Sequence, residues 1–136
     1  MSILLKFLIF AAIGVLGEVV FTALSDFFTP KKNKWDLKGH SYIWMAPIYG
    51  LGAFLCGPTL LLIKHQSWII RGCFYALIIM GIEYLAGILL REITGRCPWD
   101  YRGRAKLHVH GLVRLDYAIV WFCVGFIGEY LILNLK

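Results

Sequence analysis

Four carboxylates lie inside long apolar runs, where an ionised side chain would meet hydrocarbon rather than water. They are Glu18, Glu83, Asp116 and Glu129. An ionisable group at the centre of a membrane helix costs about 2.5–3.5 kcal/mol on insertion scales, so each one needs a partner, a proton or water. Glu129 lies toward the end of its run, where interfacial water is the simplest explanation. The others are typical of ion, proton or solute pathways.

The clearest polar stripe begins at Glu83. Glu83 and Arg91 are separated by two helical turns and therefore share one face of a helix. Glu18 lies at a similar depth in its own run, and Asp116 opens the last run. This spacing permits one polar pocket that contains Glu18, Glu83, Arg91 and Asp116. A simpler alternative is that Arg91 pairs with Asp116 or Asp100 and only fixes a loop, since a half-buried ion pair requires no functional reason.

The polar segment before the last run carries a second set of candidate residues. Trp99, Asp100 and Tyr101 could fold back as a lid over the pocket, although Trp and Tyr also anchor at the headgroup level of a bilayer. His108 and His110 would point to one side of an extended segment. An HxH pair alone is a weak metal signal. We therefore predict no metal and no cofactor.

Four apolar runs supply the elements that would position these groups. The predicted spans cover about residues 3–28, 41–64, 68–95 and 112–135, with polar loops at about 29–40 and 96–111. Each exceeds the roughly 20 residues that cross a bilayer. Pro47 and Pro58 predict a kinked second helix, and Tyr49 lies where that kink would expose backbone groups. The sequence thus predicts an all-α, integral membrane four-helix bundle that forms a single transmembrane domain over residues 1–136.

Composition agrees with a membrane protein. The chain is 60% hydrophobic and 16% charged, against about 45–50% and about 25% in a soluble domain. These values exclude a soluble globule, a disordered chain and a nucleic-acid-binding domain. Ten basic residues lie in or beside the two long loops and four on the other side. The positive-inside rule then predicts that the long loops are cytoplasmic and both termini lie opposite.

Several strings give the chain a family resemblance. GEVVFTA (17–23), EYLAGILLR (83–91), CPWDY (97–101) and GLVRLDYAIVWFC (111–123) occur in that order, with a pattern of Trp and Gly over 35–50. Over nearly the whole chain, this pattern resembles the CmpB-like type IV ABC-transporter components, and among them the vertebrate transmembrane protein 229 group.

The resemblance implies a multispanning membrane protein and marks particular residues. Its pattern falls on Glu18, Trp35, Tyr49, Gly50, Glu83, Arg91, Pro98, Trp99, Asp100, Tyr101, Gly111, Tyr117 and Trp121. Asp116 stands where some relatives have Glu, while His108 and His110 lie outside the pattern. The chain has no GxxxxGK[ST] string, so any ATP-driven role would need a separate ATPase.

These features together predict a membrane protein with an inward-opening polar pocket that binds or transports a small solute, ion or lipid headgroup. Glu18 and Glu83 would be proton or cation sites, Arg91 would hold an anionic group or clamp Asp116, and residues 99–101 would cover the entrance. A membrane-embedded lipid-modifying enzyme and a structural subunit of a membrane complex stay open as alternatives. The expected partners are the lipid bilayer, a second copy of the chain, or a separate ATPase or membrane subunit, with no nucleic acid.

Overall fold

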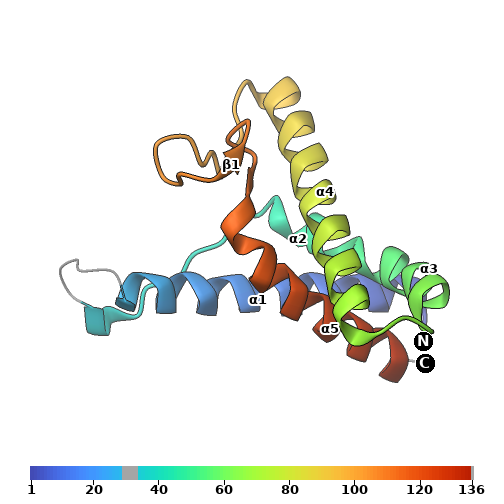
Figure 1. Ribbon diagram of the computed structural model, residues 1–136. Helices are drawn as coiled ribbons and strands as arrows, with labels where there is room; N and C mark the ends of the chain where they lie inside the picture. The colour runs from blue at the N-terminus through green and yellow to red at the C-terminus, as the bar shows by residue number, and fades with distance from the viewer. Residues whose placement is uncertain (29–33, 136) are drawn as a thin grey trace. The chain divides into compact units, whose positions relative to one another are not determined.

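The computed structural model describes residues 1–28 and 34–135 (Figure 1). Within these ranges, four helical segments are long and apolar enough to cross a membrane: Ile3–Phe28, Met45–Ile63, Trp68–Thr94 and Leu115–Asn134. The prediction of an all-α membrane protein with four spans is therefore confirmed. The second and fourth spans begin later than predicted, because hydropathy does not distinguish an apolar turn or strand from the helix that follows it.

The second span is kinked, as Pro47 and Pro58 predicted. It consists of α2 (Met45–Gly50) and α3 (Gly52–Ile63), which are interrupted at Leu51. The Leu51 N–H donates both to Pro47 O at 3.1 Å and to Ile48 O at 3.2 Å, so the helix tightens there. Pro58 lies inside α3 and has no N–H to donate to the preceding turn.

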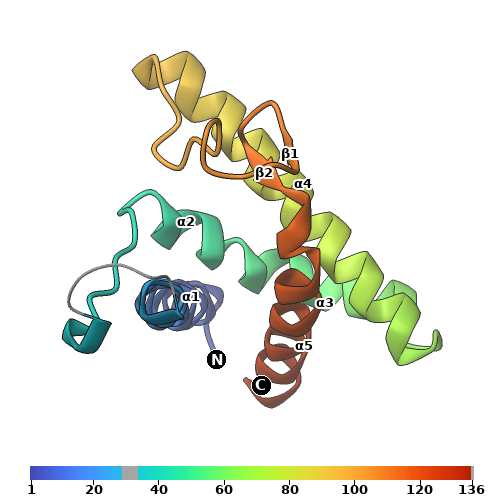
Figure 2. The ribbon, with the colours of Figure 1, turned by 60° about the vertical axis from the view of Figure 1, so that its left-hand side comes forward.

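The chain divides into two compact units, Met1–Leu55 and Cys56–Lys136, which we call the N-terminal and C-terminal units. In the N-terminal unit, α1 (Ile3–Phe28) packs against α2, and the short helix η1 (Lys34–Asp36) lies between them in sequence (Figure 2). Small residues allow this packing. A Cβ at Gly14 would lie 2.3 Å from the Tyr49 ring, so only Gly lets α2 come this close.

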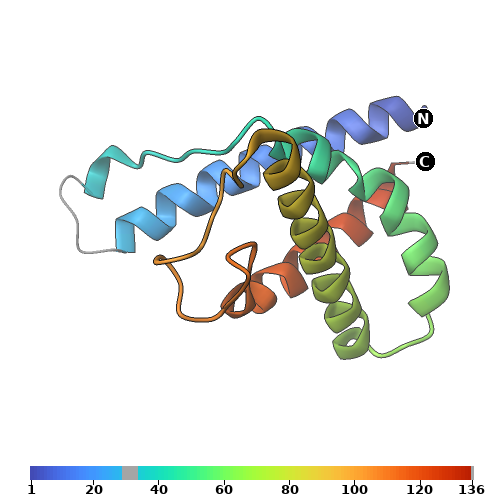
Figure 3. The same cartoon turned by 90° about the horizontal axis from the view of Figure 1, so that it is seen from above.

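In the C-terminal unit, α4 (Trp68–Thr94) crosses α5 (Ala118–Asn134) (Figure 3). Ser67 caps the start of α4 through its side chain, and Gly95 ends the helix in the left-handed conformation with φ of 76°. A Cβ at Gly125 of α5 would lie 2.2 Å from Tyr75 Cβ of α4. The two helices therefore pack with a small residue of one facing an aromatic residue of the other.

The segment between α4 and α5 folds back onto α4. It contains the antiparallel strands β1 (His108–Val109) and β2 (Val113–Arg114) and the short helix η2 (Leu115–Tyr117), and Figure 2 shows the strands beside α4. Leu112 is 1% exposed and packs where Gly87 of α4 leaves space. Trp99 Nε1 donates to Leu112 O at 3.1 Å, which closes the loop around this apolar contact.

Candidate functional site

A buried carboxylate on α4 lies under the segment that connects α4 to α5, which we call the returning segment. Glu83 is 4% exposed, and Tyr101 donates its hydroxyl to Glu83 Oε1 at 2.9 Å. Tyr101 is held in place by its own N–H, which donates to Gly111 O at 2.8 Å. The structure therefore places the Tyr101 hydroxyl against the Glu83 carboxylate.

Arg91 lies two turns further along the same face of α4. Its Nη2 donates to His110 O at 3.2 Å and lies 3.8 Å from Asp100 Oδ2. Its Nε is buried and has no hydrogen-bond partner among the described residues. Tyr84, on the same helix, makes a 2.8 Å hydrogen bond with His110 Nδ1. Arg91 and Tyr84 thus fasten the segment around His110 to α4.

Asp100 is held mainly by its near neighbour Arg102. The Arg102 N–H donates to Asp100 Oδ1 at 2.9 Å, and Arg102 Nε lies 3.0 and 2.9 Å from the two carboxylate oxygens. Hydrogen bonds from Arg102 lower the pKa of Asp100 to about 2, so this carboxylate is charged at neutral pH. Burial raises the pKa of the nearby Cys97 thiol, which keeps it protonated and a poor nucleophile.

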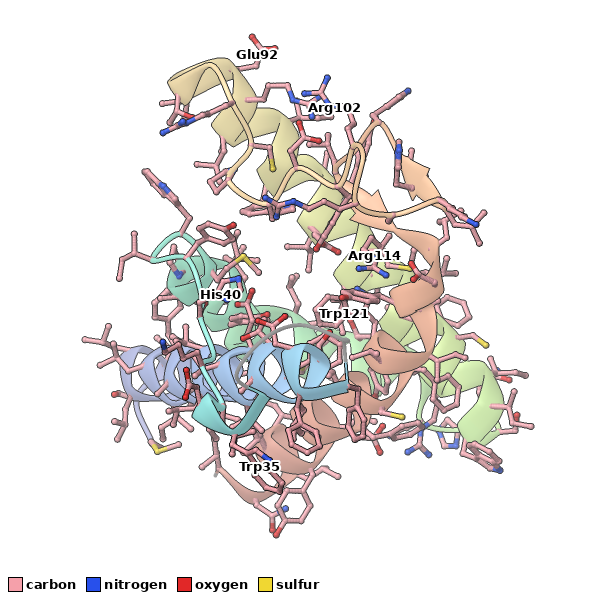
Figure 4. The ribbon with its side chains drawn as sticks, turned by 90° about the vertical axis from the view of Figure 1, so that its left-hand side faces the viewer. Trp35, His40, Glu92, Arg102, Arg114 and Trp121 are labelled. Atoms are coloured by element: carbon pink, nitrogen blue, oxygen red, sulfur yellow. The ribbon has the colours of Figure 1, made fainter. Side chains whose placement is uncertain are left out.

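Asp116 pairs with Arg114 and not with Arg91. Arg114 Nε donates to Asp116 Oδ1 at 3.1 Å, and Arg114 Nη1 donates to the Tyr117 hydroxyl at 3.0 Å (Figure 4). The Arg114 guanidinium also lies 4.0 Å from the centre of the Tyr117 ring and 5.9 Å from that of Tyr101. A cation two residues away reaches Asp116 more easily than one from another helix, so the structure favours Asp100 as the carboxylate beside Arg91.

Glu18 belongs to the N-terminal unit and accepts two hydrogen bonds. Ser41 Oγ donates to Glu18 Oε2 at 2.7 Å, and the Tyr49 hydroxyl donates to the same oxygen at 3.2 Å. The backbone before Ser41 lies against α1, because His40 N donates to Thr22 Oγ1 at 2.9 Å. Among the described residues, Glu18 has no ion pair.

The structure thus brings the predicted site residues together in two groups, one in each unit. The first contains Glu18 and Tyr49, and the second contains Glu83, Arg91, Asp116, Trp99, Asp100 and Tyr101. Trp99 is 5% exposed with its indole N–H bonded, so it does not anchor at the headgroup level. Sequence reasoning missed Ser41, since an isolated serine in a loop carries no periodic signal.

Glu129 was interpreted wrongly as a water-exposed interfacial carboxylate. It is 8% exposed and forms an ion pair with Arg71, and Tyr75 donates its hydroxyl to Glu129 Oε2 at 2.6 Å. Arg71 and Tyr75 are four residues apart, so they share one face of α4. That spacing was a usable signal, because a cation one turn from a tyrosine offers two donors to a carboxylate on an adjacent helix.

The two histidines of the returning segment form hydrogen bonds with different neighbours. His108 Nδ1 accepts from the Gly111 N–H at 3.1 Å, whereas His110 Nδ1 is bonded to Tyr84. Within residues 1–28 and 34–135, no group of three or more His, Cys, Asp or Glu side chains is arranged to hold a metal ion.

Comparison with known proteins gives a family but no structural relative. No solved structure matches the chain. A family model named for CmpB, and described as "Putative ABC-transporter type IV", matches residues 5–135. The matched range contains every carboxylate and arginine of the two groups described above. Because this match covers nearly the whole length and four helices can span a membrane, the chain is an integral membrane protein that belongs to this CmpB family.

Proposed function

We propose that this membrane protein binds and moves a small solute, ion or lipid headgroup by means of the carboxylates in its spans. One observation carries the proposal. Glu18 and Glu83 lie inside spans and accept hydrogen bonds from neutral hydroxyl groups, those of Ser41 and Tyr49 in one case and of Tyr101 in the other.

Hydroxyl partners leave a carboxylate able to exchange what it binds. A hydroxyl oxygen can donate to the charged carboxylate and can accept from the protonated one, or turn its lone pairs toward a cation. Glu129 is different, because its pair with Arg71 must break before it can take a proton or an ion. The contrast supports exchange at Glu18 and Glu83 and a structural role for Glu129.

Access to Glu83 would depend on the segment that covers it. The carboxylate is buried beneath Tyr101, so a solute or ion must displace that hydroxyl before reaching it. We assign Trp99, Asp100 and Tyr101 to a cover that opens and closes. Arg91 would hold this cover against α4 and would also bind an anion. Asp116 would act through Arg114, which it holds beside the rings of Tyr101 and Tyr117.

The basic residues support one orientation in the membrane. We propose that the loops around residues 29–40 and 96–111 face the cytoplasm, because ten of the 14 Lys and Arg residues lie in or beside them. The pocket covered by residues 99–101 would then open inward. An ATP-driven cycle would require a separate ATPase subunit, since this chain has no phosphate-binding GxxxxGK[ST] string.

The test is transport by the purified full-length protein in proteoliposomes, with proton and cation fluxes followed by fluorescent dyes. We expect Glu83→Gln and Glu18→Gln each to abolish a flux that the wild type supports. Glu92→Gln and Asp26→Asn are matched controls, because each neutralises an exposed carboxylate on the same helix. Wild-type flux in both glutamine variants, or no flux of any tested ion in the wild type, would reject carboxylate-mediated transport of these ions.

A further inference from the structure

Two arginines converge on one carboxylate near the end of α4. Arg102 makes side-chain hydrogen bonds to both oxygens of Asp100, and Arg91 Nη2 lies 3.8 Å from Asp100 Oδ2. Gly111 allows this close packing, since a Cβ there would lie 2.6 Å from Asp100 Oδ1. Figure 4 shows Arg102 beside the C-terminal half of α4, with Glu92 near the end of that helix.

The convergent arginines have binding capacity that Asp100 does not use. Arg91 makes a single hydrogen bond within the described residues, to His110 O, and its Nε has no partner there. Arg102 is 65% exposed at its side chain. Guanidinium groups present several N–H donors in a planar fork that fits phosphate as well as carboxylate. Asp100 therefore occupies a place that suits a more highly charged anion.

The surroundings are strongly basic and lie at the edge of the membrane span. Arg96, Arg104 and Lys106 are exposed in the same segment, where Asp100 is the acidic residue. Arg91 is in the last turn of α4, and we expect the end of a span of this length to lie near the lipid headgroups. The Asp100–Arg102 pair is solvent-exposed on the arginine side, and exposed pairs stabilise a fold only slightly. Displacing Asp100 from Arg102 therefore costs a competing anion little free energy.

We propose that Arg91 and Arg102 form a binding site for the phosphate group of an anionic ligand, and that Asp100 occupies this site until the ligand displaces it. The proposal rests on the proposed function in one respect, that residues 99–101 form a cover that can move. The new element is the class of ligand that the two arginines bind, a phosphate group. Binding of phosphate would draw Asp100 away and loosen the segment that covers Glu83.

A phosphate group could come from a membrane lipid or from solution. The location at the end of a span favours a lipid such as phosphatidic acid, and Ile93 and Leu107, both well exposed, could contact its acyl chains. Inorganic phosphate would use the same guanidinium groups without those contacts. The two sources are separated by testing both probes on the same protein.

The experiment measures thermal unfolding of the purified full-length protein in detergent with dioctanoyl phosphatidic acid, dioctanoyl phosphatidylcholine or inorganic phosphate. A ligand that binds the folded state raises the unfolding midpoint by an amount that grows with the logarithm of its concentration relative to its dissociation constant. We expect phosphatidic acid to raise it and phosphatidylcholine not to. Affinity should fall by about tenfold or more in Arg91→Gln and in Arg102→Gln, since each removes charge-assisted hydrogen bonds.

Asp100→Asn is the decisive variant, because it should raise the affinity for phosphatidic acid where damage to the fold would lower it. Removing the internal competitor should strengthen phosphatidic acid binding by up to about fivefold, an effect that structural damage does not produce. Arg104→Gln is the matched control, since it removes an exposed arginine of the same segment and should leave the affinity unchanged. Within the part of the chain that the structure describes, the Arg102 side chain hydrogen-bonds to Asp100 alone, so Arg102→Gln keeps the test valid if Arg91→Gln fails to fold.

Each result has a defined meaning. Equal binding of inorganic phosphate would keep the site and change the source of its ligand. No binding of either probe, weaker binding in Asp100→Asn, or an equal loss in Arg104→Gln would overturn the proposal. Because the assay needs no flux, a protein that binds phosphate but transports nothing would reject the proposed function and retain this site.

Discussion

Carboxylates inside the spans of this protein have two kinds of environment. Glu18 and Glu83 accept hydrogen bonds from neutral hydroxyls, while Glu129 is bound by the Arg71 guanidinium and by Tyr75. Hydroxyl donors can be rearranged at low cost, but breaking a buried ion pair leaves one charge without compensation. We therefore assign the proposed exchange to Glu18 and Glu83 and a structural role to Glu129.

This difference leads to a prediction about stability. Glu129→Ala should lower the free energy of unfolding by about 3 kcal/mol, because the Arg71 charge and the Tyr75 hydroxyl lose their common acceptor in a largely buried site. Thermal or denaturant unfolding in detergent measures the change. Glu92→Ala removes an exposed carboxylate and should change stability by less than about 0.5 kcal/mol. Equal effects of the two variants would show that the Glu129 pair is not structural.

At the scale of the elements, helices pack by placing aromatic side chains against glycine. Tyr49 lies on Gly14 in the N-terminal unit, and Tyr75 lies on Gly125 in the C-terminal unit. In lipid, helices associate mainly through close packing, and small residues allow the backbones to approach. A glycine in a span does not by itself indicate a contact, since Gly81 has open space beside it. Which glycines pack depends on the rotation of each helix, and the tertiary structure determines that rotation.

A pair of alanine substitutions tests this packing. Gly125→Ala should destabilise the protein by about 1–3 kcal/mol, since the new methyl would lie 2.2 Å from Tyr75 Cβ, an atom that cannot move without its helix. Gly81→Ala meets nothing within 4 Å and should stabilise α4 by up to about 1 kcal/mol through helix propensity. Unfolding midpoints of the two variants should therefore shift in opposite directions, and a shared direction would contradict the observed α4–α5 packing.

At the scale of the whole molecule, the apolar surface requires a bilayer. Large apolar side chains are exposed on all four spans, among them Leu16, Leu62, Leu77 and Ile119. α1 contains 26 residues and is about 39 Å long at about 1.5 Å per residue, which exceeds a hydrocarbon core of about 30 Å. We therefore expect α1 to tilt or to extend beyond the core.

Orientation is tested by cysteine labelling in intact cells. In a variant without the native cysteines, Gln66→Cys should react with a membrane-impermeant maleimide from outside, whereas Lys106→Cys should react only after permeabilisation. Both positions are exposed, so the reaction reports the side of the membrane and not burial. Labelling of Lys106→Cys from outside would reverse the orientation and with it the proposed inward opening.

Local composition was sufficient to predict the membrane-spanning helices. It was insufficient to predict which distant residues contact each other. Long apolar runs can satisfy their backbone only as helices in lipid, so the spans and the kink near Pro47 were predictable from the sequence. Glu129 was misread, and the surroundings of Trp99 were not predicted, since burial depends on segments far away in the chain. The Leu112 contact that buries Trp99 involves a residue 13 positions further on.

The sequence by itself determined that this is an all-α membrane protein, because hydrophobicity and helix-breaking residues act locally. Only the tertiary structure decided which donor each carboxylate receives: Tyr101 for Glu83, Arg102 for Asp100, Arg114 for Asp116 and Arg71 for Glu129. The physical reason is that hydrogen bonds and ion pairs act over only a few ångströms. Their partners are therefore selected by how the returning segment and α5 lie against α4.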